Sequence, residues 1–252
     1  MIDPHQDFII PLMRSMRGEI MAGFGKDTAT FKDNRTAVTD VDKSIEQQLA
    51  TALREKYPHI GVTGEELGKQ GNQDTYWLID PIDGTENYIR GLPGITSIVG
   101  LVEDGEVVQA YVYDPLTDVM YYAIKGKGAF ANDKKISIST RDKGRAFIAF
   151  SSSDESRDCE AAIDAAGVLY TTKYLGRGTK AVYLATGKIE GIIALGAKGG
   201  VWDIAPTNLL AVEAGAVLTD FDGQGLFSRK YCLLSPTIHD ELVEIIRKFA
   251  DA

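Results

Sequence analysis

The sequence contains little cysteine and no excess of basic residues. Its two cysteines, Cys159 and Cys232, lie far apart in a chain of 252 residues and belong to no Cys-x-x-Cys or Cys/His pattern. This spacing argues against a disulfide framework and against a thiolate metal site. The 27 Lys and Arg residues face 36 Asp and Glu residues, which gives a formal net charge of -9. Binding of nucleic acid through a basic surface is therefore not expected.

Long apolar runs are also missing. The apolar stretch at residues 192–195 soon meets Lys198, whereas a membrane-spanning helix needs roughly 20 apolar residues. The first 14 residues lack the basic and then apolar pattern of a secretory signal. With 44% hydrophobic and 25% charged residues, the composition is that of a globular protein. We therefore expect a soluble, cytoplasmic protein with no membrane partner.

Two segments near the N-terminus show helical periodicity. Apolar residues between positions 9 and 20 recur at intervals of three or four, which predicts one helix with a buried face. A second helix is predicted from Asp40 to Lys56, where apolar residues recur at every fourth position. Thr39 and Asp42 have the spacing of a capping pair at its start, and Pro58 ends it.

The strand candidates divide the chain into two patterns. Up to about residue 140, helices are followed by strands, two of which form a hairpin through the Asp104-Gly105 turn. Beyond Arg141, strand and helix candidates alternate, which is typical of a layered α/β arrangement. We predict an α/β protein with an α+β N-terminal half, in two lobes (1–140 and 141–252) that pack together. The predicted strands are 60–63, 76–79, 97–102, 107–113 and 119–124, then 147–150, 189–195, 217–221 and 231–234.

An aspartate-rich segment follows the predicted strand at residues 76–79. Asp80 precedes a proline, which favours an extended conformation and should end the strand on this carboxylate. Three residues later, Asp83 can turn back toward Asp80 and leave the Ile82 carbonyl as a third oxygen ligand. Oxygen ligands grouped in this way suit Mg²⁺. Gly84 permits close backbone approach, and Thr85 begins a short predicted helix whose N–H groups can hold phosphate.

A surface turn is the alternative interpretation of a lone Asp-x-x-Asp-Gly segment. Two further acidic segments favour the metal site instead. Glu65 and Glu66 follow the predicted strand at residues 60–63, which places two acids at another strand end. Asp203 opens a predicted apolar helix, where it can serve as a cap or as a ligand. The candidate ligands thus come from distant parts of the sequence.

Four short segments occur in a fixed order: Val38-Thr39-Asp40-Val41-Asp42, Gly64-Glu65-Glu66, Asp80-Pro81-Ile82-Asp83-Gly84-Thr85 and Trp202-Asp203. This is the pattern of the inositol monophosphatase family, which the chain resembles from end to end. The resemblance implies a layered αβαβα sandwich that assembles as a homodimer. It also implies Mg²⁺-dependent, lithium-sensitive hydrolysis of a small phosphate monoester.

The resemblance assigns metal ligands to individual residues. Glu65, Asp80 and the Ile82 carbonyl are expected to bind one Mg²⁺ ion. Asp80, Asp83 and Asp203 are expected to bind a second, and a third, weaker ion is expected near Glu65. Two metals can stabilise the attacking and the leaving oxygen together, so neither a histidine nor a covalent intermediate is required.

The resemblance also implies catalytic and phosphate-binding roles. Glu65 and the Thr85 hydroxyl are expected to activate the water that attacks phosphorus. Asp42 is expected to orient Thr85. Gly84 and Thr85 are expected to hold the phosphate group of the substrate.

The substrate is less well defined than the reaction. Gly178, Thr179 and Lys180 match the segment that lines the family's substrate pocket. A family glutamate just upstream of Trp202-Asp203 is absent, because residues 196–200 read Gly-Ala-Lys-Gly-Gly. Lys198 in this stretch can meet a second anionic group, or it can be a solvated loop lysine. Inositol 1-phosphate is the first candidate as the family default, with histidinol phosphate, fructose 1,6-bisphosphate and 3'-phosphoadenosine 5'-phosphate as alternatives. A non-catalytic sugar-phosphate-binding or regulatory role on the same scaffold is the alternative of another class.

Overall fold

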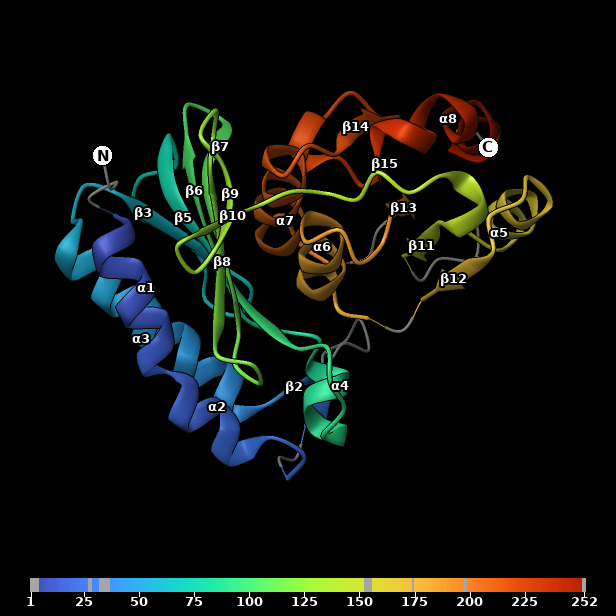
Figure 1. The fold of residues 1–252 in the computed structure, drawn as a ribbon. Helices are drawn as coiled ribbons and strands as arrows, with labels where there is room; N and C mark the ends of the chain where they lie inside the picture. Colours follow the sequence, from blue (N-terminus) through green and yellow to red (C-terminus); the bar gives the residue numbers. More distant parts are fainter. Residues whose placement is uncertain are drawn as a thin grey trace.

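The chain forms five layers of helices and sheets (Figure 1). This computed structural model describes residues 5–26, 29–31, 37–151, 156–173, 175–196 and 199–250. N-terminal helices cover one face of an eight-stranded sheet, and two helices separate it from a five-stranded sheet. Two more helices cover the outer face of the second sheet. The predicted αβαβα sandwich is confirmed.

The outer N-terminal layer contains three helices: α1 (Gln6–Ser15), α2 (Arg17–Gly23) and α3 (Asp40–Lys56). The predicted helical N-terminus with a buried apolar face is confirmed, although Met16 divides it into α1 and α2. The prediction for α3 is confirmed. Its first turn is a capping box, in which the Thr39 hydroxyl accepts from the Asp42 N–H and the Asp42 carboxylate accepts from the Thr39 N–H.

The first sheet has the order β10-β9-β8-β7-β6-β5-β3-β4, and its strands pair antiparallel except for β3 with β5. In the predicted hairpin between β6 and β7, Asp104 and Gly105 have φ values of 50° and 80°, so both central residues of the turn are left-handed. A separate short ribbon pairs β1 (Thr30–Phe31) with β2 (Ala37–Val38). The strands are β3 (Gly61–Gly64), β4 (Gly68–Gln70), β5 (Thr75–Asp83), β6 (Thr96–Glu103), β7 (Glu106–Asp114), β8 (Val119–Ile124), β9 (Gly128–Ala131) and β10 (Lys134–Ile136).

Strand β5 is longer than predicted. It was expected to end at Asp80, but it pairs with β6 through Asp83, with an irregularity in the register between these two aspartates. The hydroxyl of Ser97 donates to the Pro81 carbonyl at 2.6 Å, so a side chain satisfies the backbone where the regular ladder is interrupted. Both aspartates therefore project from one bulged strand. The short helix α4 (Thr85–Arg90) follows, as predicted.

The second sheet has the order β12-β11-β13-β15-β14. Strand β11 pairs parallel with β12 and β13, whereas β15 pairs antiparallel with β13 and β14. Its strands are β11 (Phe147–Phe150), β12 (Tyr170–Thr172), β13 (Gly191–Leu195), β14 (Val217–Asp220) and β15 (Lys230–Leu234). Helices α5 (Ser156–Ala165) and α8 (Pro236–Ala250) cover its outer face, and short 3-10 turns lie at Lys143–Arg145 and Gly225–Phe227. Cys159 and Cys232 are free thiols buried in this outer core.

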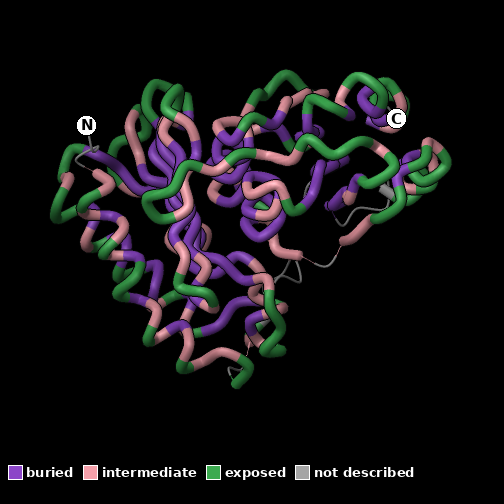
Figure 2. Tube along the Cα trace, viewed as in Figure 1, coloured by how far each residue is buried: buried purple, intermediate pink, exposed green. Residues whose placement is uncertain are grey.

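Helices α6 (Arg177–Ala185) and α7 (Val201–Glu213) form the central layer and pack on both sheets. Every residue from Asp203 to Ala211 is buried, so α7 has no solvent-exposed face over this stretch and is mainly apolar. Figure 2 shows this central region as buried. The boundary between two lobes at residue 140 stays a prediction. No described helix is long and apolar enough to cross a membrane.

Candidate active site

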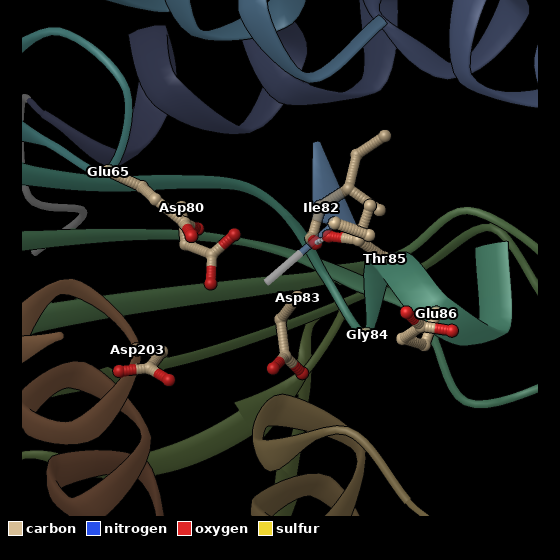
Figure 3. A pocket seen from close by; sticks show the side chains of 9 residues that line it. Glu65, Asp80, Ile82, Asp83, Gly84, Thr85, Glu86 and Asp203 are labelled. Carbon is tan, nitrogen blue, oxygen red and sulfur yellow. Dashed lines mark hydrogen bonds between the residues drawn. The ribbon is translucent and has the colours of Figure 1, made fainter. Parts of the chain in front are cut away.

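A pocket lies between the end of β5, the start of α4 and the first turn of α7 (Figure 3). Its volume is about 280 Å³. Most of the acidic residues predicted for the site line it, although they come from three distant parts of the sequence. The lining residues are Ala37, Glu65, Asp80, Ile82, Asp83, Gly84, Thr85, Glu86 and Asp203.

Three buried carboxylates form the centre of the pocket. One oxygen each from Asp80, Asp83 and Asp203 lies within 4.8 Å of the others. Asp80 Oδ1 and Asp203 Oδ1 are buried and accept no hydrogen bond. Buried carboxylate oxygens without a partner are costly, so this arrangement fits a bound cation that the oxygens would ligate.

Burial and neighbouring carboxylates raise the pKa of two of the clustered aspartates, Asp80 and Asp203. Burial, and then the charges of Glu65, Asp83, Asp203 and Asp42, raises the pKa of Asp80 well above its ordinary value. Burial also raises the pKa of Asp203, although the positive charge of Arg177 opposes the change. A divalent cation would remove this penalty by favouring the ionised carboxylates.

Asp83 connects β5 to the start of α6. Its carboxylate accepts hydrogen bonds from the backbone N–H groups of Arg177 at 3.1 Å and Gly178 at 2.8 Å, and from the Thr96 hydroxyl at 3.2 Å. A carboxylate at a helix N-terminus satisfies donors that the helix itself cannot pair, and it interacts favourably with the helix dipole. The orientation of Asp83 is therefore set by both α6 and β6.

Thr85 lies between the pocket and the capping box of α3. Its hydroxyl is 3.0 Å from the Ile82 carbonyl oxygen and 3.5 Å from Asp42 Oδ1. The other oxygen of Asp42 accepts from both the N–H and the hydroxyl of Thr39. Burial raises the pKa of Asp42 to about 6, although the hydrogen bonds from Thr39 oppose the change. Above that pH, Asp42 is an acceptor for the Thr85 hydroxyl.

Glu65 lines the same pocket, although it is not one of the three carboxylates whose oxygens lie within 4.8 Å of one another. It follows β3, and its N–H donates to the Ile79 carbonyl at 3.2 Å. The buried Glu46 of α3 accepts from the next two N–H groups, those of Glu66 at 2.8 Å and Leu67 at 3.0 Å. Sequence reasoning missed Glu46, because a glutamate in a predicted helix gives no sign that it binds a distant turn.

Of the residues predicted to bind substrate, Gly84 and Thr85 line the pocket, whereas the others do not line it or lie outside the described residues. Gly178 and Thr179 lie in the first turn of α6 and do not line the pocket. The Gly178 N–H donates a hydrogen bond to Asp83, which does line it. Lys198 lies outside the described residues. Gly84 is left-handed with φ 89°, and a Cβ there would lie 2.7 Å from the Gly94 carbonyl oxygen, so the position requires glycine.

Two cations lie in the first turn of α6: Lys180 belongs to the segment predicted to line the substrate pocket, and Arg177 was not assigned a role from the sequence. The Arg177 side chain donates to Asp203 Oδ2 at 3.1 Å. The Lys180 ammonium donates to the Phe150 carbonyl at 2.8 Å and is buried. Burial, together with the charge of Arg177, lowers the pKa of Lys180 to about 8. Arg177 directly precedes the predicted segment Gly178-Thr179-Lys180, and this neighbourhood was the available signal that Arg177 lies near the site.

Comparison with known proteins agrees with this site. The sequence profile of the inositol monophosphatase family matches residues 5–250. The chain belongs to the inositol monophosphatase family. It is 35% identical to the Nus factor SuhB of Xylella fastidiosa over 199 residues, covering 76% of this chain and 72% of the relative. It is 28% identical to the fructose-1,6-bisphosphatase/inositol-1-monophosphatase of Thermotoga maritima, covering 97% and 96% of the two chains.

A solved structure supports the same assignment. The Thermotoga maritima IMPase superposes with a TM-score of 0.89 at 26% identity, covering 99% of both chains. Membership of the inositol monophosphatase family makes this protein a phosphoric monoester hydrolase. The family is metal-dependent, and the cluster of Asp80, Asp83 and Asp203 is consistent with a metal centre.

Proposed function

We propose that the protein hydrolyses a small phosphate monoester with Mg²⁺ as its metal, and that inositol 1-phosphate is the first candidate substrate. The observation that carries this proposal is the group of three buried carboxylates, two of which have an oxygen without a hydrogen-bond partner. A surface turn would leave such oxygens in water. A non-catalytic scaffold would gain nothing from burying them together.

The proposed ligand set follows the predicted one. Asp80, Asp83 and Asp203 would hold one Mg²⁺ ion, and Glu65, Asp80 and the Ile82 carbonyl would hold another. The Ile82 carbonyl already lies 3.0 Å from the Thr85 hydroxyl, and its second lone pair can serve a metal. When bound, Mg²⁺ would neutralise charge on the phosphate and lower the pKa of a coordinated water.

The protein groups around that ion would orient the reactants and move the proton. Glu65 and the Thr85 hydroxyl would accept hydrogen bonds from an attacking water. Thr85 can pass its own proton toward Asp42, which is 3.5 Å away and fixed by Thr39. The backbone at Gly84 and Thr85 would bind the phosphate at the start of α4.

Fructose 1,6-bisphosphate is the second candidate for a specific reason. The Thermotoga maritima relative named as both a fructose-1,6-bisphosphatase and an inositol-1-monophosphatase covers nearly the whole chain. In addition, Gly196 and its neighbours lack the glutamate expected of many inositol-phosphate enzymes. A substrate with a second phosphate is therefore compatible with this part of the chain.

Phosphate release from a panel of esters tests the proposal. The panel comprises inositol 1-phosphate, histidinol phosphate, fructose 1,6-bisphosphate and 3'-phosphoadenosine 5'-phosphate, each measured with Mg²⁺ and with EDTA. We expect Mg²⁺-dependent release from more than one ester and inhibition by lithium. Release that is equal in EDTA would refute the metal assignment, and release from a single ester would refute a tolerant pocket.

We also propose that the enzyme is a cytoplasmic homodimer, as the family resemblance implies. Light scattering after gel filtration measures the mass directly. A dimer should have about twice the chain mass of 27.4 kDa. A mass that stays at the monomer value at micromolar concentration would contradict the assembly.

A further inference from the structure

Arg177 places a positive charge directly against the carboxylate cluster. Its Nε donates to Asp203 Oδ2 at 3.1 Å, and its Nη1 donates to the Tyr231 hydroxyl at 3.1 Å. The backbone N–H of the same residue donates to Asp83. Its side chain is only 14% exposed. One residue at the start of α6 thus contacts two of the three clustered carboxylates.

This contact has a clear electrostatic purpose in the metal-free protein. Three buried carboxylates within 4.8 Å repel one another, and their removal from water adds to the cost. A guanidinium keeps its proton in proteins, and the one on Arg177 lies directly against Asp203 Oδ2. The guanidinium therefore stays charged and offsets part of the repulsion.

The two oxygens of Asp203 have different environments. Oδ2 is bound by Arg177, whereas Oδ1 is buried without a hydrogen-bond partner. An ion bound at Oδ1 would share one carboxylate with the guanidinium. Two positive charges so close together in a buried site repel each other strongly.

We propose that Arg177 is a built-in counter-cation of the cluster, which stabilises the metal-free fold and weakens the binding of a metal ion at Asp203. This inference rests on the proposed function, because it takes Asp203 as a metal ligand. It differs from a purely orienting role, in which Arg177 would hold Asp203 in place and strengthen metal binding. The two roles predict opposite changes in Mg²⁺ affinity.

Two substitutions separate charge from geometry. Arg177→Gln removes the charge but keeps an N–H donor for Asp203, whereas Arg177→Lys keeps the charge and loses the planar fork. Thermal unfolding in EDTA and over a series of Mg²⁺ concentrations gives the apparent affinity from the dependence of stability on free metal. We expect Arg177→Gln to unfold at a lower temperature in EDTA and to bind Mg²⁺ on the order of tenfold more tightly than wild type. Arg177→Lys should stay within about threefold of wild type.

Arg141→Gln is the matched control. Arg141 pairs with the buried Glu190 and does not line the pocket. Its loss should lower the unfolding temperature without changing Mg²⁺ affinity. Comparison of the three variants therefore separates the loss of an arginine partner of a buried carboxylate from the loss of the charge beside Asp203.

Each remaining outcome is decisive. Weaker or unchanged Mg²⁺ binding in Arg177→Gln would overturn the counter-cation role. If this variant folds only when Mg²⁺ is present, the role is supported, since the cluster then needs another cation. If it fails to fold even with saturating Mg²⁺, the role is overturned. If Mg²⁺ stabilises neither wild type nor any variant, the proposed metal site itself fails. If Mg²⁺ instead binds wild type and the Arg177 variants with equal affinity, only the counter-cation role fails.

Discussion

The carboxylate of Asp83 accepts a 2.8 Å hydrogen bond from the backbone N–H of Gly178, although the two residues are 95 positions apart in the sequence. Asp83 lies at the end of a strand in the first sheet, and Gly178 lies in the first turn of a central helix. The bond holds the side chain of a candidate metal ligand on β5 against the N-terminus of α6. It also joins the aspartate motif to the segment predicted to line the substrate pocket.

Asp83→Asn should abolish turnover and leave the fold largely intact. An amide keeps the size of the side chain and one oxygen acceptor, but it loses the negative charge that a cation requires. We expect the rate of phosphate release to fall by on the order of 100-fold or more. The thermal stabilisation by Mg²⁺ should be lost in the same variant. Near wild-type turnover would contradict the assignment of Asp83 as a ligand.

Local sequence signals predicted that Asp80, Asp83 and Asp203 come together in the fold. Asp80 and Asp83 follow a strongly apolar strand, and Asp203 opens a strongly apolar helix, so each residue could be placed at the end of an element. The same reasoning ended β5 too early, because the hydroxyl that satisfies the Pro81 carbonyl belongs to Ser97 on the next strand. Such a partner cannot be recognised from the local pattern.

Contacts between distant elements were the part that the sequence did not reveal. Arg177 and Asp203 form a buried pair across two helices that are adjacent only in the fold. Glu46 likewise binds N–H groups 20 and 21 residues away. Spacing within a motif carries no information on such pairs, because their geometry depends on how the layers pack.

Gly178→Ala should impair the site through Thr96. A Cβ at position 178 would lie 2.1 Å from the Thr96 hydroxyl oxygen, which donates to Asp83. Thr96 is buried, so it cannot move away without displacing its neighbours, and we expect a loss of about 1–3 kcal/mol in the free energy of unfolding. Turnover should fall with it. Chemical denaturation and phosphate-release assays measure the two effects.

Gly18→Ala is the control for that substitution. A Cβ at Gly18 in α2 would meet no atom within 4 Å, so alanine should raise the free energy of unfolding by about 0.5–1 kcal/mol through its higher helix propensity. Its turnover should be unchanged. A Gly178→Ala enzyme as stable and active as Gly18→Ala would refute the steric argument.

Glu46→Gln should weaken Mg²⁺ binding although Glu46 is no candidate ligand. The carboxylate accepts from the Glu66 and Leu67 N–H groups and so fixes the turn that begins at Glu65. Glutamine has only one acceptor oxygen, so one of these N–H groups loses its partner. We expect about tenfold weaker Mg²⁺ binding, measured by thermal unfolding over a Mg²⁺ series.

Glu190→Gln provides the comparison for Glu46→Gln. Glu190 is also fully buried and also accepts two hydrogen bonds, from Arg141 and from the Phe147 N–H, but it does not line the pocket. Both variants should lose about 1–3 kcal/mol of stability. Only Glu46→Gln should change Mg²⁺ affinity, and equal affinities in the two variants would show that Glu46 is merely structural.

Asp42 should make the metal-free protein less stable as the pH rises from about 4 to above 6. Its pKa is about 6 in the folded protein, against 3.8 as the ordinary value, and burial is the main cause. A carboxyl whose pKa is raised by folding contributes stability that is fully present below the unfolded pKa and lost as the pH passes the folded pKa. Urea unfolding in EDTA between pH 4 and pH 7 measures this slope. Asp42→Asn should make the slope shallower without removing it, because the pKa values of Asp80 and Asp203 are also raised. Asp158→Asn, which removes an exposed carboxylate of α5, should leave the slope unchanged. If the wild type and Asp42→Asn show the same slope, Asp42 does not titrate in this range, and its role as a hydrogen-bond acceptor for Thr85 must extend to lower pH.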